Sequence, residues 1–181
     1  EDLERVKGVL KLGFASDALL RWVFTDASSF LKSFDIWMEE FSKIAFENDI
    51  VYTEKNFYGA SLWHPPGAHF DSSALEPTFA FIPADRIEVV IKLFGEFEKY
   101  HPEDAWYLPF IAVDPARQRQ GIGSFLLKEA LQMIDEKNER AYLEASNEQN
   151  KALYERHGFV EIGRVQFEDS PPVFPMIRDP H

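Results

Sequence analysis

Hydrophobic residues recur every three or four positions in three stretches of this chain, the spacing of a helix with one apolar face. This spacing predicts helices over residues 3–14, 30–44 and 87–100. Residues Asp26 to Ser29 precede the second stretch and are of the types that cap a helix N-terminus. We therefore expect a helical layer built largely from the first half of the chain.

Two short runs rich in β-branched and aromatic residues, 50–53 and 57–63, are separated by the polar residues 54–56. This arrangement predicts a β-hairpin. The prolines at 65–66 cannot donate hydrogen bonds to a neighbouring strand, so the second strand must end there. The residues that follow, as far as Ser73, are expected to form a loop.

A nearly continuous apolar run over residues 106–113 predicts a strand buried on both faces. Pro109 interrupts it, and proline inside a central strand is disfavoured unless a bulge or a local splay removes the need for its N–H group. The sequence therefore predicts a bulge or a splay at Pro109, and a splay would open a gap between neighbouring strands. Further strands are expected over 142–145, 159–167 and 174–178.

No internal repeat, linker or low-complexity segment divides the 181 residues, so we expect one domain over 1–181. The formal charge of −12 disfavours nucleic acid and anionic membranes as partners and favours a cationic ligand, although solubility explains an acidic surface equally well. The chain has no cysteine and no apolar run long enough to span a membrane, which suits a cytoplasmic protein.

After the strand that ends at Val113, a polar and glycine-containing loop leads directly into a helical pattern. Gly121 and Gly123 permit a close approach of a ligand to the backbone, and the first turn of the helix offers unpaired N–H groups and a positive dipole end. These features predict a pyrophosphate site, with a plain strand-to-helix turn as the alternative. The third glycine of a dinucleotide fingerprint and the Gly-Lys-Ser/Thr of a P-loop are absent.

A second helical segment follows the strand over 142–145 and is expected to end at His157, before Gly158. Asn147, Asn150 and Tyr154 recur at steps of three and four residues. They therefore share one face of this helix and can line one groove.

Together these segments resemble the GNAT superfamily of N-acetyltransferases. Gln118-x-x-Gly121-x-Gly123 matches the acetyl-CoA pyrophosphate signature of that family, and the spacing of Asn147, Asn150, Tyr154 and Gly158-Phe159 resembles its second conserved element. Other segments look like the branch that includes puromycin N-acetyltransferase: 60–67, 142–145, 154–159 and 175–178.

The resemblance implies an α/β (α+β) acyl-CoA N-acyltransferase fold, with a mixed, twisted and splayed sheet of about six or seven strands and helices on both faces. The superfamily usually begins with a strand, whereas this sequence begins with the helix at Leu3, so an edge strand is expected to be missing. The co-substrate implied is acetyl-CoA. The residues expected to bind it are Ile111, Ala112, Val113, Gln118, Arg119, Gln120, Gly121, Ile122, Gly123, Ser124, Asn147, Asn150 and Tyr154.

Tyr154 is the expected general acid, because a phenol can protonate a departing thiolate; a groove or core tyrosine is the alternative. Glu144 is the expected general base, since a carboxylate on an apolar strand needs a partner or a task. Asp104 and Glu103 are the other candidates for the base, and a solvated charge at the strand edge is the alternative role of Glu144.

The expected reaction is direct acetyl transfer to the primary amine of a small molecule, in a monomer or homodimer. The alternatives are an acyl-CoA sensor without turnover and an enzyme that acetylates a protein or peptide. Aromatic residues at 22, 34, 37 and 63 are candidates for an acceptor pocket or for the core, and His64 and His69 flank the loop beside it. The five histidines have no metal-ligand spacing, so no metal is expected.

Overall fold

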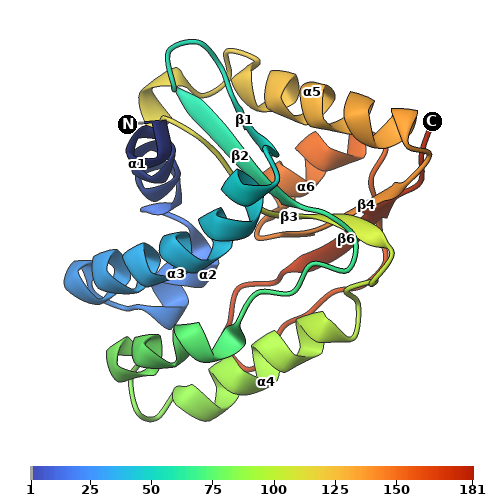
Figure 1. The fold of residues 1–181 in the computed structure, drawn as a ribbon. Helices are drawn as coiled ribbons and strands as arrows, with labels where there is room; N and C mark the ends of the chain where they lie inside the picture. The colour runs from blue at the N-terminus through green and yellow to red at the C-terminus, as the bar shows by residue number, and fades with distance from the viewer. Residues whose placement is uncertain (1) are drawn as a thin grey trace.

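The computed structural model describes residues 2–181 and contains one mixed sheet of six strands within that range (Figure 1). The strand order is β1-β2-β3-β4-β6-β5, and only the β3–β4 pair is parallel. This architecture confirms the predicted fold class. The strands are β1 Val51–Thr53, β2 Gly59–His64, β3 Ala105–Val113, β4 Arg140–Ala145, β5 Val160–Glu161 and β6 Phe174–Arg178.

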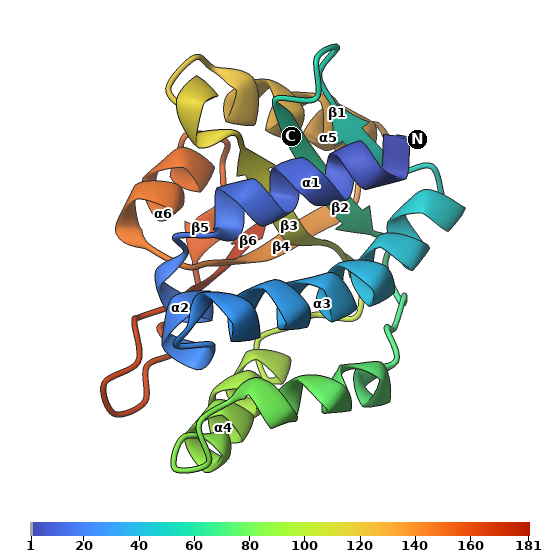
Figure 2. The same ribbon diagram turned by 90° about the vertical axis from the view of Figure 1, so that its left-hand side faces the viewer.

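Helices cover both faces of the sheet (Figures 1 and 2). The N-terminal helices α1, α2 and α3 lie against one face, and α5 and α6 lie on the other, while α4 packs below the first group. The first described element is α1, as the sequence predicts. The helices are α1 Asp2–Phe14, α2 Ala18–Val23, α3 Ala27–Glu47, α4 Ile87–Glu98, α5 Ile122–Glu136 and α6 Glu148–Glu155.

The predicted helices and the hairpin are confirmed, and Asp26 caps α3 by accepting a hydrogen bond from the N–H of Ser29 at 3.0 Å. Two elements were not predicted: the short helix α2 and a 3-10 helix over Ser72–Phe81, which begins at the end of the predicted loop. Within residues 2–181, no helix combines the length and the apolar character needed to cross a membrane.

Phe110 of β3 anchors the core between the sheet and the N-terminal helices. Its ring meets Phe14 and Phe41 edge-on at 5.2 Å and Phe34 at 5.8 Å. A buried phenylalanine contributes about 2–3 kcal/mol by leaving water, and edge-to-face contacts add to this. On the opposite face, the apolar side of α5 is buried. The sheet around β3 is therefore held from both sides.

The sheet opens at Pro109, as predicted. On the β2 side the register shifts, so that Leu108 and Pro109 both lie opposite Trp63, which is a β-bulge. On the other side, the pairing of β3 with β4 ends at Tyr107 and Tyr142, although both strands continue. The second half of β3 therefore has a neighbour on one edge only, and a splay separates it from β4.

The predicted strand over 159–167 is wrong. Only β5 pairs there, and Val165 forms a single bridge with Val173. Gly163 lies within the break and packs against Tyr100, since a Cβ at this position would lie 2.4 Å from its ring. The segment between β5 and β6 leaves the sheet and reaches α2, where the indole N–H of Trp22 donates a hydrogen bond to Asp169 at 3.0 Å.

The helix expected to end at His157 is slightly shorter, since α6 ends at Glu155.

Candidate active site

The loop between β3 and α5 has the backbone geometry of an anion-binding turn. Asp114 fixes its start by accepting a hydrogen bond from the N–H of Ala116 at 2.8 Å. Arg119 and Gly121 both have positive φ, 63° and 85°, and Gly121 is the N-cap of α5. Within the described chain, no hydrogen bond outside the helices is donated by the amides of residues 118–124. These N–H groups are available to a ligand.

Gly123 marks the place where three separately predicted segments meet. A Cβ added there would lie 3.6 Å from the side chain of Leu153 on α6 and 3.7 Å from that of Val113 at the end of β3. The first turn of α5 thus lies between β3 and α6. The loop, the open edge of β3 and the tyrosine-bearing helix consequently belong to one region.

The residues predicted to contact a pantetheine arm lie beyond the bulge. Ile111, Ala112 and Val113 pair with β2 but not with β4, so the other edge of their backbone faces the splay. Gln118 and Gln120 are exposed, and the side chain of Gln118 reaches back to the carbonyl of Val113 at 3.4 Å. An extended ligand could therefore use this strand edge as a partner.

Two predicted binding residues have side chains that already bond within the protein. The hydroxyl of Ser124 lies 2.7 Å from Nε2 of His157, which ties the start of α5 to the end of α6. Asn147 caps α6, because its side-chain oxygen accepts a hydrogen bond from the N–H of Asn150 at 2.8 Å. Their side chains therefore serve the scaffold, and any contact of Ser124 with a phosphate would come from its backbone N–H.

Tyr154 lies in the last turn of α6 and is 6% exposed. Its ring meets Phe159 edge-on at 5.9 Å. Its hydroxyl makes no hydrogen bond among those formed by the described residues. Burial, and after it the negative charge of Asp17, raises the pKa of Tyr154 above that of an ordinary phenol. The side chain is therefore a neutral phenol at physiological pH.

Glu144 is half-buried on β4, on the same face as Tyr142. Burial raises the pKa of Glu144 to about 7, and the nearby hydroxyls of Tyr107 and Tyr142 partly oppose this rise. The rings of both tyrosines contact His101, with centroids 4.5 and 4.9 Å apart. The Tyr142 hydroxyl is fully buried and has no partner of ordinary hydrogen-bond geometry in residues 2–181. A carboxyl group with this pKa can exchange protons at neutral pH.

The structure does not bring the other candidate bases to the splay. Asp104 forms an ion pair with Arg140 before β3 begins, and Glu103 is exposed one residue earlier. Both lie at the end of β3 that is farthest from the glycine loop. Glu144 is therefore the candidate among the three that faces the splay.

The aromatic candidates divide into core and surface residues. Phe34 and Trp63 are almost fully buried and belong to the core. Trp37 packs between Phe24 and Phe94, whereas Trp22 donates a hydrogen bond to Asp169 in the segment between β5 and β6.

His64 lies at the buried end of β2 and not in a polar loop, and its Nε2 is 2.9 Å from the carbonyl oxygen of Phe41. Burial lowers the pKa of His64 to about 4. His69 is exposed. His64 is therefore a buried strand residue, and of these two histidines only His69 lies in the loop.

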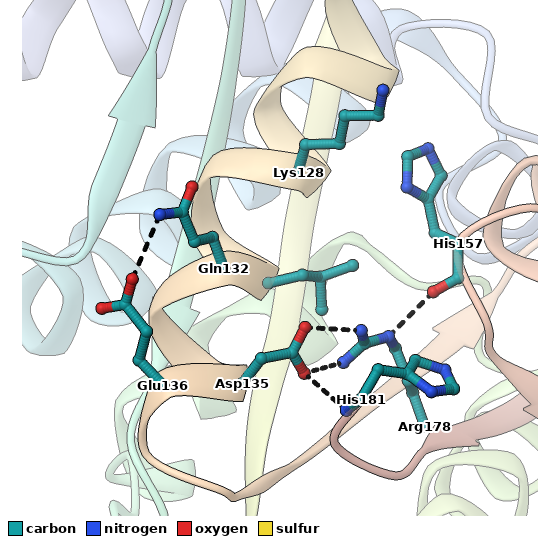
Figure 3. Close-up of a pocket in the computed structure, with 8 residues that line it drawn as sticks. Lys128, Gln132, Asp135, Glu136, His157, Arg178 and His181 are labelled. Carbon is teal, nitrogen blue, oxygen red and sulfur yellow. Dashed lines mark hydrogen bonds and ion pairs between the residues drawn. The ribbon is translucent and has the colours of Figure 1, made fainter.

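The two described cavities lie outside this region. One, of about 440 Å³, lies between α5 and the C-terminal segment, where Arg178 donates two hydrogen bonds to Asp135, at 2.6 and 2.8 Å, and one to the carbonyl of His157 (Figure 3). The other, of about 570 Å³, is lined by Trp106 and by Tyr52 of β1, among others. In residues 2–181 no group of three metal-ligating side chains is found.

Sequence reasoning missed Asp17, which caps α2 and also bonds to the segment after β4. Its Oδ2 atom accepts a hydrogen bond from the hydroxyl of Ser146 at 2.6 Å, across 129 positions of sequence. The only local signal is an N-cap residue before a short apolar run, which predicts a helix start but not a role in a site.

Comparisons with known proteins agree with this geometry. Residues 84–161 match the model of the acetyltransferase (GNAT) domain family. An uncharacterized N-acetyltransferase of Schizosaccharomyces pombe is 26% identical over 153 residues, covering 72% of this chain and 60% of the relative. The chain thus spans less than two thirds of that protein.

Solved structures share the whole fold. The crystal structure of histone acetyltransferase HPA2 and related acetyltransferase from Corynebacterium glutamicum has a TM-score of 0.67 and 25% identity, covering 99% of this chain and 92% of the other. Arylalkylamine N-acetyltransferase 2 from Aedes aegypti has a TM-score of 0.64 and 11% identity, covering 99% and 94%. The second likeness is one of fold alone.

Residues 84–161 therefore resemble a GNAT acetyltransferase domain, and the chain is similar to N-acetyltransferases in sequence and in fold.

Proposed function

We propose that this protein transfers an acetyl group from acetyl-CoA to the primary amine of a small molecule, by direct attack in a ternary complex. The observation that carries the proposal is the meeting of three features around Gly123. These are the open edge of β3, the amides before α5 that make no hydrogen bond among residues 2–181, and the helix α6, which carries the buried Tyr154 next to Leu153. Each supplies one requirement of acetyl transfer from a thioester.

The residues present fit acetyl-CoA. The backbone of Ile111 and Val113 has a free strand edge that can hydrogen-bond the amides of the pantetheine arm, as an added strand would. The amides of residues 119–124 would hold the pyrophosphate, with the helix dipole of α5 adding to the attraction. We infer that the splay at Pro109 exists to admit this arm.

Two side chains would move protons during the transfer. The amine nitrogen forms a bond to the acetyl carbon while the carbon–sulfur bond breaks, and Tyr154 donates its phenolic proton to the departing sulfur. Glu144 accepts the proton that the ammonium form of the acceptor loses before it attacks. The second N–H proton leaves the nitrogen as the amide forms and returns to the tyrosinate of Tyr154, which replaces the proton given to sulfur. A base with a pKa of about 7 is well matched to this task at neutral pH, since half of its molecules are ionised there.

We infer a small-molecule acceptor from the resemblance of several segments to the branch of puromycin N-acetyltransferase. The fold likeness to an arylalkylamine N-acetyltransferase agrees with this, and the name of the Corynebacterium structure favours the alternative of a protein substrate. An acyl-CoA sensor without turnover is the other alternative. The proposal includes one domain over residues 1–181, a cytoplasmic location and a monomer or homodimer.

The experiment that separates these functions follows free-thiol release from acetyl-CoA in the presence of three acceptor sets. The sets are small primary amines, peptides with free N-termini, and no acceptor. Thiol release with small amines and not with peptides supports the proposal. Release with peptides alone would move the function to protein acetylation, and binding of acetyl-CoA without release under any condition would favour the sensor.

A further inference from the structure

The elbow, which we define as residues 15–17 between α1 and α2, crosses the opening between β3 and β4. Just before it, Gly13 of α1 packs directly on β3, because a Cβ there would lie 2.5 Å from the Cβ of Ala112. At its end, Asp17 bonds to Ser146, the first residue after β4. Figure 2 shows α1 running across the front of the sheet towards α2. The elbow thus closes one side of the splay and places Asp17 at the β4 edge.

Asp17 carries a charge that its structural role does not require. Its Oδ1 atom accepts a hydrogen bond from the N–H of Leu20 at 3.0 Å, which caps α2. Asparagine caps a helix as well as aspartate does. The N-caps Asp26 and Asp71 are exposed, whereas burial raises the pKa of Asp17. The ionised form of Asp17 therefore costs folding free energy, which the cap alone does not explain.

No cationic side chain described within residues 2–181 forms an ion pair with this carboxylate. None of the ion pairs formed within residues 2–181 includes Asp17, and none includes Glu144. Glu144 lies two positions before Ser146, so the Cα atoms of these two residues are about 7 Å apart along the extended chain. After burial, the negative charge of Asp17 is the second cause of the raised pKa of Tyr154. Two carboxylates that belong to no ion pair within residues 2–181 thus lie at the β4 side of the splay, Glu144 on the strand and Asp17 bonded to the residue that follows it.

We propose that the Asp17 carboxylate binds the ammonium group of the acceptor, so that the enzyme selects primary alkylamines, which are cations at neutral pH, over neutral arylamines. This inference rests on the proposed function. The bound ammonium supplies the counter-ion that the folded chain lacks, while Ser146 holds the carboxylate in place. Asp17 is thereby a substrate-binding residue, distinct from the acid Tyr154 and the base Glu144.

The test compares wild type with Asp17→Asn, which keeps the cap and the size of the side chain but removes the charge. Thiol release is measured at pH 7 with butylamine, benzylamine, spermidine and aniline. For the best alkylamine we expect KM to rise about 30-fold in Asp17→Asn, as for loss of one partner of a close charge pair. The kcat value changes far less, and the low activity with aniline is unaffected. Asp26→Asn is the matched control, an N-cap outside the site, and leaves KM for the alkylamines unchanged.

Thermal unfolding at pH 7 separates the two roles of Asp17. If its carboxylate only stabilised the fold, Asp17→Asn would lower Tm. Removing an uncompensated charge while keeping the cap raises Tm, so Asp17→Asn is expected to unfold at a higher temperature than wild type. A lower Tm together with an unchanged amine KM overturns the inference, and so does failure of wild type to acetylate any of the three alkylamines while it binds acetyl-CoA. Titration calorimetry with acetyl-CoA distinguishes failure of this inference from failure of the proposed function. Absence of acetyl-CoA binding by wild type overturns the proposed function itself.

Discussion

The two sides of the splay present different chemistry. On the side of β3 and the start of α5, the groups that face the site are backbone amides, and the nearby polar side chains of Ser124 and Asn147 are bonded within the protein. On the side of β4, the facing groups are the half-buried side chains of Glu144 and Asp17, neither of which belongs to an ion pair within residues 2–181. The first side recognises a ligand by shape and by N–H direction. The second depends on charge, so the two should respond differently to mutation and to pH.

The largest effect is expected where the two sides meet. Tyr154→Phe removes the proton donor and keeps the ring that packs on Phe159, so kcat should fall by about 100- to 1,000-fold. The Kd for acetyl-CoA should change little, because the binding amides are untouched. Steady-state kinetics and titration calorimetry check the two halves of this prediction. A kcat within a factor of two of wild type would remove Tyr154 from the mechanism.

Arg178 tests whether the cavity in Figure 3 is structural. Arg178→Ala deletes a buried guanidinium that bonds twice to Asp135 and once to the carbonyl of His157. Loss of one partner of such a pair typically costs about 3 kcal/mol of unfolding free energy. Urea denaturation should show this loss, while the remaining folded protein keeps its Kd for acetyl-CoA. Wild-type stability with a weakened Kd would instead make the cavity part of the binding site.

Glu144→Gln should lower kcat/KM for an amine by about 30-fold and change its pH dependence. The pKa of Glu144 is raised to about 7, so the active carboxylate form is lost as pH falls through 7 and is gained as pH rises above it. Wild-type activity should therefore increase through pH 7 more steeply than that of the variant with the same amine. Identical pH profiles for both proteins would exclude Glu144 as the base.

The smallest effect is predicted for Ser124→Ala. Its hydroxyl bonds to His157, and only its backbone N–H faces the loop region, so the Kd for acetyl-CoA should stay within about threefold of wild type. The lost hydrogen bond should appear as a small decrease in Tm. A large loss of affinity without loss of stability would show that the hydroxyl itself contacts the phosphate.

Much of this architecture could be predicted because its signals are local. The spacing of apolar residues marked α1, α3, α4 and α5, and the loop to Gly123 carried its own motif. Pro109 predicted the opening of the sheet, since a missing N–H group prevents a regular ladder on any fold.

The features that could not be predicted depend on contacts between distant parts of the chain. The strand expected after Phe159 pairs only at 160–161, and beyond it Gly163 packs closely against the ring of Tyr100, a contact that the local sequence does not indicate. His64 is buried by Phe41, although it precedes two prolines. The local sequence indicates only that Asp17 caps a helix, because its hydrogen bond with Ser146 depends on α1 lying across β3. Such contacts follow from tertiary packing.

The most direct test of the central claim is titration calorimetry of acetyl-CoA with wild type, Gly123→Trp and Gly95→Trp. A Cβ at Gly123 fits at ordinary contact distances, but an indole would fill the space before the loop amides, whereas Gly95 on α4 has open space around it. We expect acetyl-CoA to bind wild type and Gly95→Trp, and to bind Gly123→Trp with a Kd at least about 100-fold higher. Equal binding by all three proteins, or no binding by wild type, would contradict it.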